Sequence, residues 1–347
     1  MAYTSINKGS DYFNNVLYTG TGSTNAQTGV GFQPDLVWLK RRDNAGRHRL
    51  FDAVRGATKS VRSDDSEAEI TRADSLTSFD SDGFTLGADS ISGGINVNIS
   101  GETMVGWSWR GSDSSAVSNT DGSITSTVSA NTTSGFSIVS WTGTGANATV
   151  GHGLSSAPKM IIVKNRDNTE EWKVYHASLG ATLFLRLNST AAQTSSATYQ
   201  WNGTTPTSSV FSVGEGNSTN TTDYIAYCFA EKKGFSKFGS YTGNGSTDGT
   251  FVYTGFKPAF VMIKKVSSAE AWWLIDDARD PYNPAGTKYI LPNSSDAEVT
   301  TNNKPMDLLS NGFKLRDATG YHNDVATYIY MAFAEEPLVG DNPATAR

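Results

Sequence analysis

Cysteine is almost absent from this chain of 347 residues, which contains only Cys228. No disulfide can form within the chain, so a disulfide-stapled secreted scaffold is excluded. Long apolar runs are also missing. No stretch reaches the ~18 residues of a membrane-spanning helix, and the first residues hold no apolar core of signal-peptide length. We therefore expect a protein that is made and folded in a cytoplasm, with no insertion into a membrane.

Charge is scarce: charged residues make up 18% of the chain and the formal net charge is −6. An acidic balance repels phosphate backbones, so nucleic acid is not expected as a partner. One basic exception comprises Lys40-Arg41-Arg42, Arg47 and Arg49. We interpret it as a solvated turn, because no aromatic stacking platform is interleaved with it.

Helical periodicity is also poor, while turn-forming residues are abundant. The 34 Gly and the many Ser, Thr and Asn residues are typical of short strands joined by turns. The 8 Trp, 14 Tyr and 16 Phe residues exclude a disordered chain. The best helical exception is 63–76, where a short surface helix is predicted. Its acidic cluster is interpreted as a solvated face and comprises Asp64, Asp65, Glu67 and Glu69.

What the sequence does have is self-similarity at a fixed spacing. A proline precedes an apolar run that ends in lysine, three times over. The three pairs are Pro34 and Lys40, Pro158 and Lys164, and Pro258 and Lys264. The copies are 124 and then 100 residues apart. Tyr-Thr-Gly or Trp-Thr-Gly segments precede each block, and an aromatic closing strand follows it. Between them the first and third copies have a Gly-Phe turn, which the middle copy matches only loosely with Val210-Phe211-Ser212-Val213.

A charged block recurs in two of the three copies. Asp52 and Arg55 match Asp276 and Arg279, whereas the middle copy has His176 in place of the aspartate. We expect each pair to fix a turn at the surface, where an ion pair contributes only ~0–1 kcal/mol. His176 is interpreted as a drifted structural position.

The blocks predict the fold class: all-β, with three tandem antiparallel β-sandwich (jelly-roll-like) repeats of about 100 residues. The proline suits the start of a strand, where no ladder N–H is needed, and the lysine is expected to mark the exit of that strand into water. Closing strands carry aromatics two apart, as in Trp107 and Trp109 or Tyr227 and Phe229. Such pairs share one face and are expected to fill the core between the two sheets of each sandwich.

Boundaries follow from the copies. They are an N-terminal extension at 1–10, repeat one at 11–110, a Ser/Thr-rich linker at 111–134, repeat two at 135–231, repeat three at 234–336 and an extended tail at 337–347. The segment 111–134 is either an exposed linker or a long strand-and-loop crossover. Repeats two and three, with no linker between them, are expected to pack rigidly. Three such units can stand around an approximate threefold axis or in a row.

No constellation of catalytic or metal-binding residues emerges, so we predict a non-enzymatic protein with no cofactor and no metal. The four histidines, His48, His152, His176 and His322, fit no metal spacing. Cys228 has no motif around it and is interpreted as a small buried hydrophobe. Asp80-Ser81-Asp82-Gly83 resembles the opening of a calcium loop but lacks the closing glutamate. Gly20-x-Gly22 is interpreted as a turn.

The chain resembles a family of marine phage proteins, of the cyanophage type, described as virion structural or tail-fibre-like. The resemblance covers nearly the whole chain. It rests on Tyr12-Phe13-Asn14-Asn15-Val16-Leu17-Tyr18-Thr19-Gly20, Gly31-Phe32-Gln33-Pro34-Asp35-Leu36-Val37-Trp38, Leu50-Phe51-Asp52-Ala53-Val54-Arg55-Gly56-Ala57, Gly135-Phe136-Ser137-Ile138-Val139 and Tyr330-Met331-Ala332-Phe333-Ala334-Glu335. This resemblance implies no catalytic residues.

The resemblance implies a place in the virion, with other virion proteins as partners. One interpretation is a tail or fibre component that attaches to a host surface, with exposed aromatic loops stacking on a glycan. The alternative is a capsid decoration protein that stabilises the head. A depolymerase of host polysaccharide is a third class, since 34 Asp and Glu residues can always supply a pair of carboxylates. We expect a homo-oligomer, a trimer in preference, because virion sites are symmetric.

Overall fold

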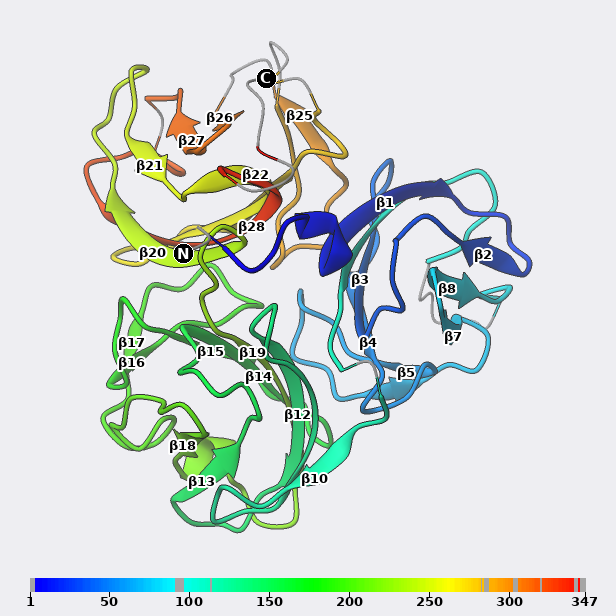
Figure 1. Cartoon of the computed structure of the whole chain (residues 1–347), viewed down its shortest axis with the longest axis vertical. Helices are drawn as coiled ribbons and strands as arrows, with labels where there is room; N and C mark the ends of the chain where they lie inside the picture. Colours follow the sequence, from blue (N-terminus) through cyan, green and yellow to red (C-terminus); the bar gives the residue numbers. More distant parts are fainter. Residues whose placement is uncertain are drawn as a thin grey trace.

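The computed structural model of the chain describes residues 4–90, 97–112, 114–281, 283, 287–301, 305–318, 320–339 and 343. These residues form an all-β protein whose strands pair antiparallel in several sheets. The helical elements among them are two 3₁₀ turns, η1 (Gly9–Asp11) and η2 (Glu215–Asn217). Figure 1 shows three lobes around a common centre, in the order of the chain.

The first lobe is built on the four-stranded sheet β1-β9-β3-β4, which packs against the smaller sheet β2-β8-β7, with a ribbon β5-β6 beside them. Its strands are β1 (Phe13–Thr19), β2 (Asn25–Gln27), β3 (Leu36–Arg41), β4 (Arg49–Asp52), β5 (Lys59–Ser60), β6 (Ile70–Thr71), β7 (Leu76–Asp80), β8 (Gly83–Leu86) and β9 (Thr103–Trp109). The first strand pairs with the last and the second with the last but one, which is a jelly-roll-like nesting.

The second lobe repeats this plan and extends it. Its large sheet has the order β10-β11-β12-β19-β14-β15, with the small sheet β13-β18 and the ribbon β16-β17. The strands are β10 (Val117–Asn119), β11 (Ser126–Asn131), β12 (Phe136–Thr142), β13 (Ala148–Gly151), β14 (Met160–Asn165), β15 (Lys173–His176), β16 (Leu183–Phe184), β17 (Thr194–Ser195), β18 (Val210–Val213) and β19 (Asp223–Phe229). The segment 111–134 therefore carries two strands that join the sheet of the second lobe, which is the crossover alternative.

The third lobe has the large sheet β20-β28-β22-β23, the small sheet β21-β27-β26 and the ribbon β24-β25. The strands are β20 (Ser236–Thr242), β21 (Phe251–Tyr253), β22 (Phe256–Lys265), β23 (Trp272–Asp276), β24 (Thr287–Tyr289), β25 (Val299–Thr301), β26 (Met306–Leu309), β27 (Gly312–Leu315) and β28 (Thr327–Pro337). Pro34 and Pro158 lie two residues before their strands. Pro258 lies inside β22, at a shift of register where its missing N–H is tolerated.

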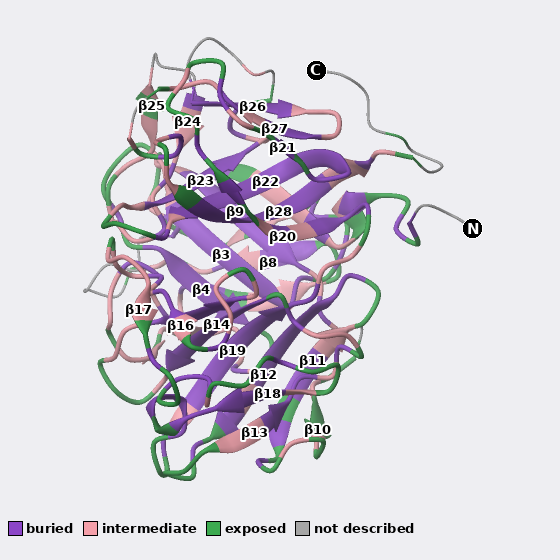
Figure 2. Ribbon diagram, turned by 90° about the vertical axis from the view of Figure 1, so that its left-hand side faces the viewer, coloured by how far each residue is buried: buried purple, intermediate pink, exposed green. Residues whose placement is uncertain are grey.

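The large sheets are buried on both faces, as Figure 2 shows for the long central strands. Alternate side chains of a strand point to opposite faces, so each strand serves two cores. In β19, Tyr224, Ala226 and Cys228 face the small sheet of the same lobe. Ile225, Tyr227 and Phe229 join a cluster shared by all three lobes.

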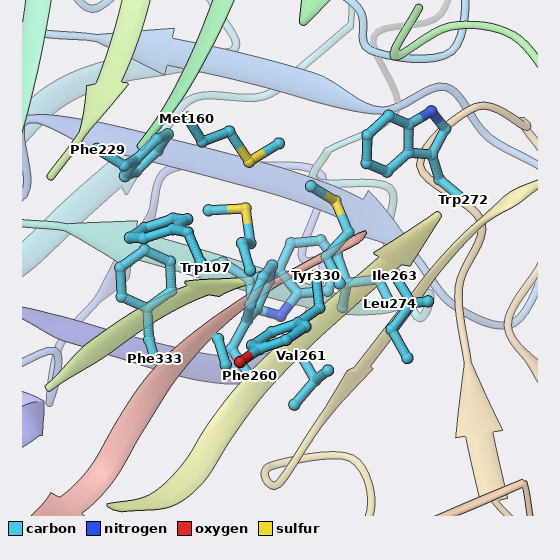
Figure 3. Close-up of a cluster of buried hydrophobic side chains, with 14 of the residues drawn as sticks. Trp107, Met160, Phe229, Phe260, Val261, Ile263, Trp272, Leu274, Tyr330 and Phe333 are labelled. Atoms are coloured by element: carbon cyan, nitrogen blue, oxygen red, sulfur yellow. The ribbon is translucent and has the colours of Figure 1, made fainter. Parts of the chain in front are cut away.

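The aromatic closing residues therefore lie at the centre of the molecule, in a core between lobes. The expectation that they fill the core between the two sheets of one sandwich is wrong. Trp109, Phe229 and Phe333 come from β9, β19 and β28 and contact one another, with ring centroids 6.4, 5.8 and 5.8 Å apart. Figure 3 shows Phe229 and Phe333 in this cluster, beside Phe260 and Met160. Burial of such large rings is the largest favourable contribution a core can make.

The N-terminal extension belongs to this closed arrangement. Ile6 is buried in the shared cluster, and η1 packs against β28 of the third lobe. Gly9 makes this approach possible, because a Cβ there would lie 2.2 Å from the carbonyl oxygen of Ala334. The beginning of the first lobe is thus held on the third, and the three lobes form a ring.

One local expectation is wrong and another is untested. No helix forms over 63–76, where the chain is irregular apart from β6 and the first residue of β7. The tail 337–347 lies mostly outside the described residues, of which 337–339 and 343 are placed.

Candidate functional site

The predicted pair Asp52 and Arg55 lies at the junction of the first and second lobes, with both side chains fully buried. Arg55 bonds Asp52 through its Nε and through its backbone N–H, and also donates to the carbonyl of Leu50. Tyr227 of the second lobe donates its hydroxyl to Asp52 at 2.8 Å and accepts from Arg55 at 3.2 Å. The interpretation of this pair as a surface turn is therefore wrong, because it connects two lobes.

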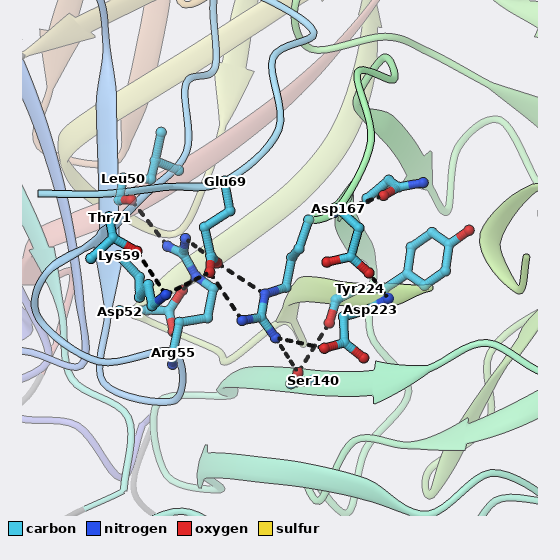
Figure 4. Close-up of polar contacts among 12 residues, drawn as sticks. Leu50, Asp52, Arg55, Lys59, Glu69, Thr71, Ser140, Asp167, Asp223 and Tyr224 are labelled. Atoms are coloured by element: carbon cyan, nitrogen blue, oxygen red, sulfur yellow. Dashed lines mark hydrogen bonds and ion pairs between the residues drawn. The ribbon is translucent and has the colours of Figure 1, made fainter. Parts of the chain in front are cut away.

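Glu69 extends this junction toward the second lobe (Figure 4). It bonds Arg55 at 3.2 Å and takes a two-bond contact from Arg166 at 2.9 and 3.1 Å. Burial opposes the charge of Glu69, but Arg166 and Arg55 outweigh it and hold the pKa of its carboxyl below the usual value. The backbone N–H of Glu69 also donates to the carbonyl of Arg166. Within the acidic cluster, Glu69 and the buried Asp64 are thus not on a solvated face, whereas Glu67 is exposed.

The junction between the third and first lobes has the same kind of buried charge pair, completed by an aromatic residue of the other lobe. Asp276 and Arg279 are fully buried, and Trp107 of the first lobe donates its indole N–H to Asp276 at 3.0 Å. Glu298 bonds Arg279 at 3.3 Å and Arg42 at 2.9 and 3.0 Å. Arg42 therefore bridges lobes, and the interpretation of the basic cluster around it as a solvated turn is wrong.

The second and third lobes meet without these charges. His176 occupies the place of the aspartate and donates from Nε2 to the carbonyl of Tyr330 at 3.2 Å, since its Nδ1 accepts the N–H of Ser178. Burial lowers the pKa of His176 to about 4, so the ring is neutral at pH 7. Gln193 and Val266 stand where the other junctions have glutamate and arginine, and the backbone bond between them, 2.9 Å, is retained.

The three repeat lysines are fully buried, so the expectation that they exit into water is wrong. Each ammonium donates to a backbone carbonyl of the neighbouring lobe. Lys40 bonds Ser295, Lys164 bonds Ser66 and Lys264 bonds Thr190, at 3.4, 3.0 and 3.3 Å. Burial lowers the pKa of each to about 8. These contacts run in one direction around the ring and join every lobe to the next.

The remaining candidates have local roles. Asp82 accepts the N–H groups of Gly29 and Gly31, and Asp80 accepts Ser78 and Thr85, so both carboxylates serve the loops around them. Cys228 is buried, and burial raises the pKa of its thiol. Among the described residues, no group of His, Cys, Asp and Glu is placed to hold a metal ion. Likewise, none of their helical segments has the length and apolarity to cross a membrane.

A polar recess of about 960 Å³ lies where the chain crosses from the first lobe to the second. It is lined by Gly31, Phe32, Gln33, Asp35, Ala53, Ser81, Arg110, Ser112, Ser114, Ser115, Ala116 and Ser129. Its size is within the ~300–1,000 Å³ of small-molecule sites. Among these described residues hydroxyls are the most frequent polar groups, accompanied by one amide, one carboxylate and one guanidinium group, so the recess can exchange many hydrogen bonds with a polar ligand.

Sequence reasoning missed this recess, and also the partners Tyr227, Trp107 and Glu298. One signal was available for the recess: 111–134 is the segment that breaks the repeat spacing. For the junctions, the signal was the loss of aspartate and arginine together in the middle copy, which indicates that the two residues act jointly.

Three similar β units closed into a ring by buried contacts define the structural class of this protein. The chain belongs to the DUF7483 family, a domain of unknown function, whose match covers residues 8–337. The match therefore includes all three lobes. Searches of curated proteins and of solved structures find no match.

Proposed function

We propose that this chain is a non-enzymatic structural protein of a bacteriophage particle, placed in the tail or a fibre and used in attachment to the host surface. The observation that carries the proposal is a set of exposed aromatic rings on a tightly closed body. Tyr199, Tyr253 and Tyr321 are 59, 53 and 51% exposed. Rigid aromatic side chains supply contact area at low entropic cost, which suits adhesion.

The likeness of the repeated segments to virion structural proteins supports the same proposal. So does the ring itself, because lobes that share a buried apolar core resist separation under load. The virion, with its other structural proteins as partners, would be the place of the chain.

Gold-labelled antibody against the chain, applied to intact particles and imaged by electron microscopy, tests the location. Label on the tail is the expected result. Label spread over the head would contradict the tail assignment and favour the alternative, a capsid decoration protein. The three-lobed shape favours that alternative, because such a body matches a threefold position on a shell.

The absence of enzymatic activity is tested separately. Host surface polysaccharide incubated with the chain should keep its length in size-exclusion chromatography. Shortened fragments would contradict the non-enzymatic part of the proposal and favour a depolymerase.

Self-association is the third part of the proposal, with a homotrimer as the favoured form. The inner contacts of the ring are used within one chain, so a trimer would assemble through the outer surfaces. Light scattering at micromolar concentration should give three times the mass of the chain. A strict monomer would contradict it.

A further inference from the structure

The segment 111–134 is an insertion that the repeat does not need. It adds 24 residues between the first and second copies, whereas the third copy begins at Gly234-Phe235 directly after the second. The third lobe nevertheless forms the same four-stranded sheet. Ile124 and Val128 of the insertion are buried in the core of the second lobe, but the third lobe shows that a lobe can form without such a segment.

The insertion builds one wall of the polar recess. Its two strands, β10 and β11, extend the large sheet of the second lobe beside the first lobe (Figure 1). Five lining residues belong to it: Ser112, Ser114, Ser115, Ala116 and Ser129. The opposite wall comes from loops of the first lobe, including Gln33 and Ser81. The recess is thus a product of the insertion.

Asp35 is the fixed polar group in this recess. It is only 4% exposed, and its carboxylate accepts the N–H of Gly111 and the hydroxyl of Ser129, both at 2.8 Å. Gly111 is required for this arrangement, because a Cβ there would lie 2.8 Å from Asp35 Cγ and 2.7 Å from Ser129 Oγ. The carboxylate of Asp35 therefore holds the insertion on the first lobe and fixes the position of Ser129 in the wall of the recess.

The fold of a repeat does not require an aspartate at position 35. The residues at the same place in the other copies, directly after Pro158 and Pro258, are Lys159 and Ala259. The aspartate and the insertion that holds it therefore occur together, at one junction of the ring.

We infer that this recess binds a neutral saccharide of the host surface. Sugars present adjacent hydroxyls, which pair with carboxylate, amide, guanidinium and serine groups, and the lining has all four. Among the lining residues that the structure describes, the carboxylate of Asp35 and the guanidinium of Arg110 balance in charge, so this part of the lining favours neither an anionic nor a cationic ligand. The inference rests on the proposed attachment function and adds, apart from the exposed tyrosines, a site with a stated ligand class.

The test uses the full chain and a panel of neutral oligosaccharides, namely linear oligomers of glucose, galactose, mannose and N-acetylglucosamine. Oligogalacturonate serves as the anionic comparison. Saturation-transfer NMR detects binding and titration calorimetry measures it. We expect at least one neutral series to bind, and oligogalacturonate to bind at least tenfold more weakly.

Two variants locate the site. Gln33→Ala removes an exposed amide from the lining, and Ser115→Trp fills the recess from an exposed position. Each should weaken binding at least tenfold without changing the unfolding temperature. Ser208→Trp places the same ring at an exposed serine of the second lobe, outside the lining, and should bind as the unaltered chain does. Equal binding by the two tryptophan variants, or binding of no neutral oligosaccharide, would overturn the inference.

Adsorption of the fluorescent chain to host cells separates this inference from the proposed function. We expect Ser115→Trp to adsorb at least tenfold more weakly than Ser208→Trp. If both adsorb as the unaltered chain does, attachment stands and the recess is not its site. If the unaltered chain adsorbs to no host cell, the attachment function falls and the inference with it.

Discussion

Tyr227 in the closing strand of the second lobe donates its hydroxyl to Asp52 of the first lobe, 175 residues earlier in the chain. The same tyrosine accepts a bond from Arg55. A residue of one lobe therefore completes the buried charge pair of another. Because Trp107 does the same for Asp276, two of the three junctions in the ring depend on such a partner.

Arg55→Met tests the energetic weight of this junction. It leaves Asp52 buried without its cation, and breaking a buried pair from one side typically costs about 3–5 kcal/mol. We expect the free energy of unfolding, measured in urea, to fall by about that amount.

Two controls accompany that measurement. Lys8→Met removes an exposed ion pair with Asp11 and should change the stability by no more than about 0.5 kcal/mol. The triple variant Asp52→Leu, Arg55→Met and Tyr227→Phe makes the junction apolar and should lose less than Arg55→Met alone. We therefore expect the buried charges to give no more stability than apolar residues in their place, and a larger loss in the triple variant would contradict this.

Acid should destabilise the protein in the range where histidines titrate. Burial lowers the pKa of His176 and His322 to about 4, from 6.5 in the unfolded chain. Between these values the unfolded state binds more protons, so stability is lost as the pH falls below about 6.5. The unfolding temperature should decline from pH 7 to pH 5, and His176→Asn should decline less. A flat profile would contradict the buried, neutral state of these rings.

Alkali should first stabilise the protein and then destabilise it. The pKa of Lys40, Lys164 and Lys264 is lowered by burial to about 8, so the unfolded state binds more protons between about pH 8 and 10.5 and stability rises there. Burial raises the pKa of Tyr227 and Tyr241 well above 10, so above pH 10 the unfolded chain loses protons that the folded one keeps. Unfolding temperatures should therefore rise from about pH 8 and reach their maximum near pH 10.

Lys164→Met isolates the lysine contribution and should reduce the rise between pH 8 and 10. A steady decline of the unaltered chain from pH 7 upward would show that the three lysines stay protonated in the folded state.

The strands and the three copies could be predicted from the sequence because their signals are local. A proline before an apolar run, or aromatics two residues apart, is visible in a window of ten residues. The burial of Lys40 could not be predicted in this way, because its ammonium donates to the carbonyl of Ser295, which is far away in the sequence. A lysine after an apolar run has the same local pattern whether it meets water or another lobe.

Burial of Asp52 and Arg55 could not be predicted for the same reason. The spacing indicated an ion pair, and the pair is present. Its burial depends on Tyr227 and Glu69, which contact the pair only in the folded ring. The helix expected over 63–76 failed because this segment is held by the second lobe, where Glu69 pairs with Arg166. Tertiary contacts there override a weak local preference.

Differential scanning calorimetry tests whether the three lobes form one closed ring with a shared core. Because Trp109, Phe229 and Phe333 join all three lobes, we predict one transition with equal calorimetric and van't Hoff enthalpies. Phe333→Ala, which should cost about 3–5 kcal/mol, should move that single transition to lower temperature. Two or three separate transitions in the unaltered chain would contradict the claim and show that the lobes unfold independently.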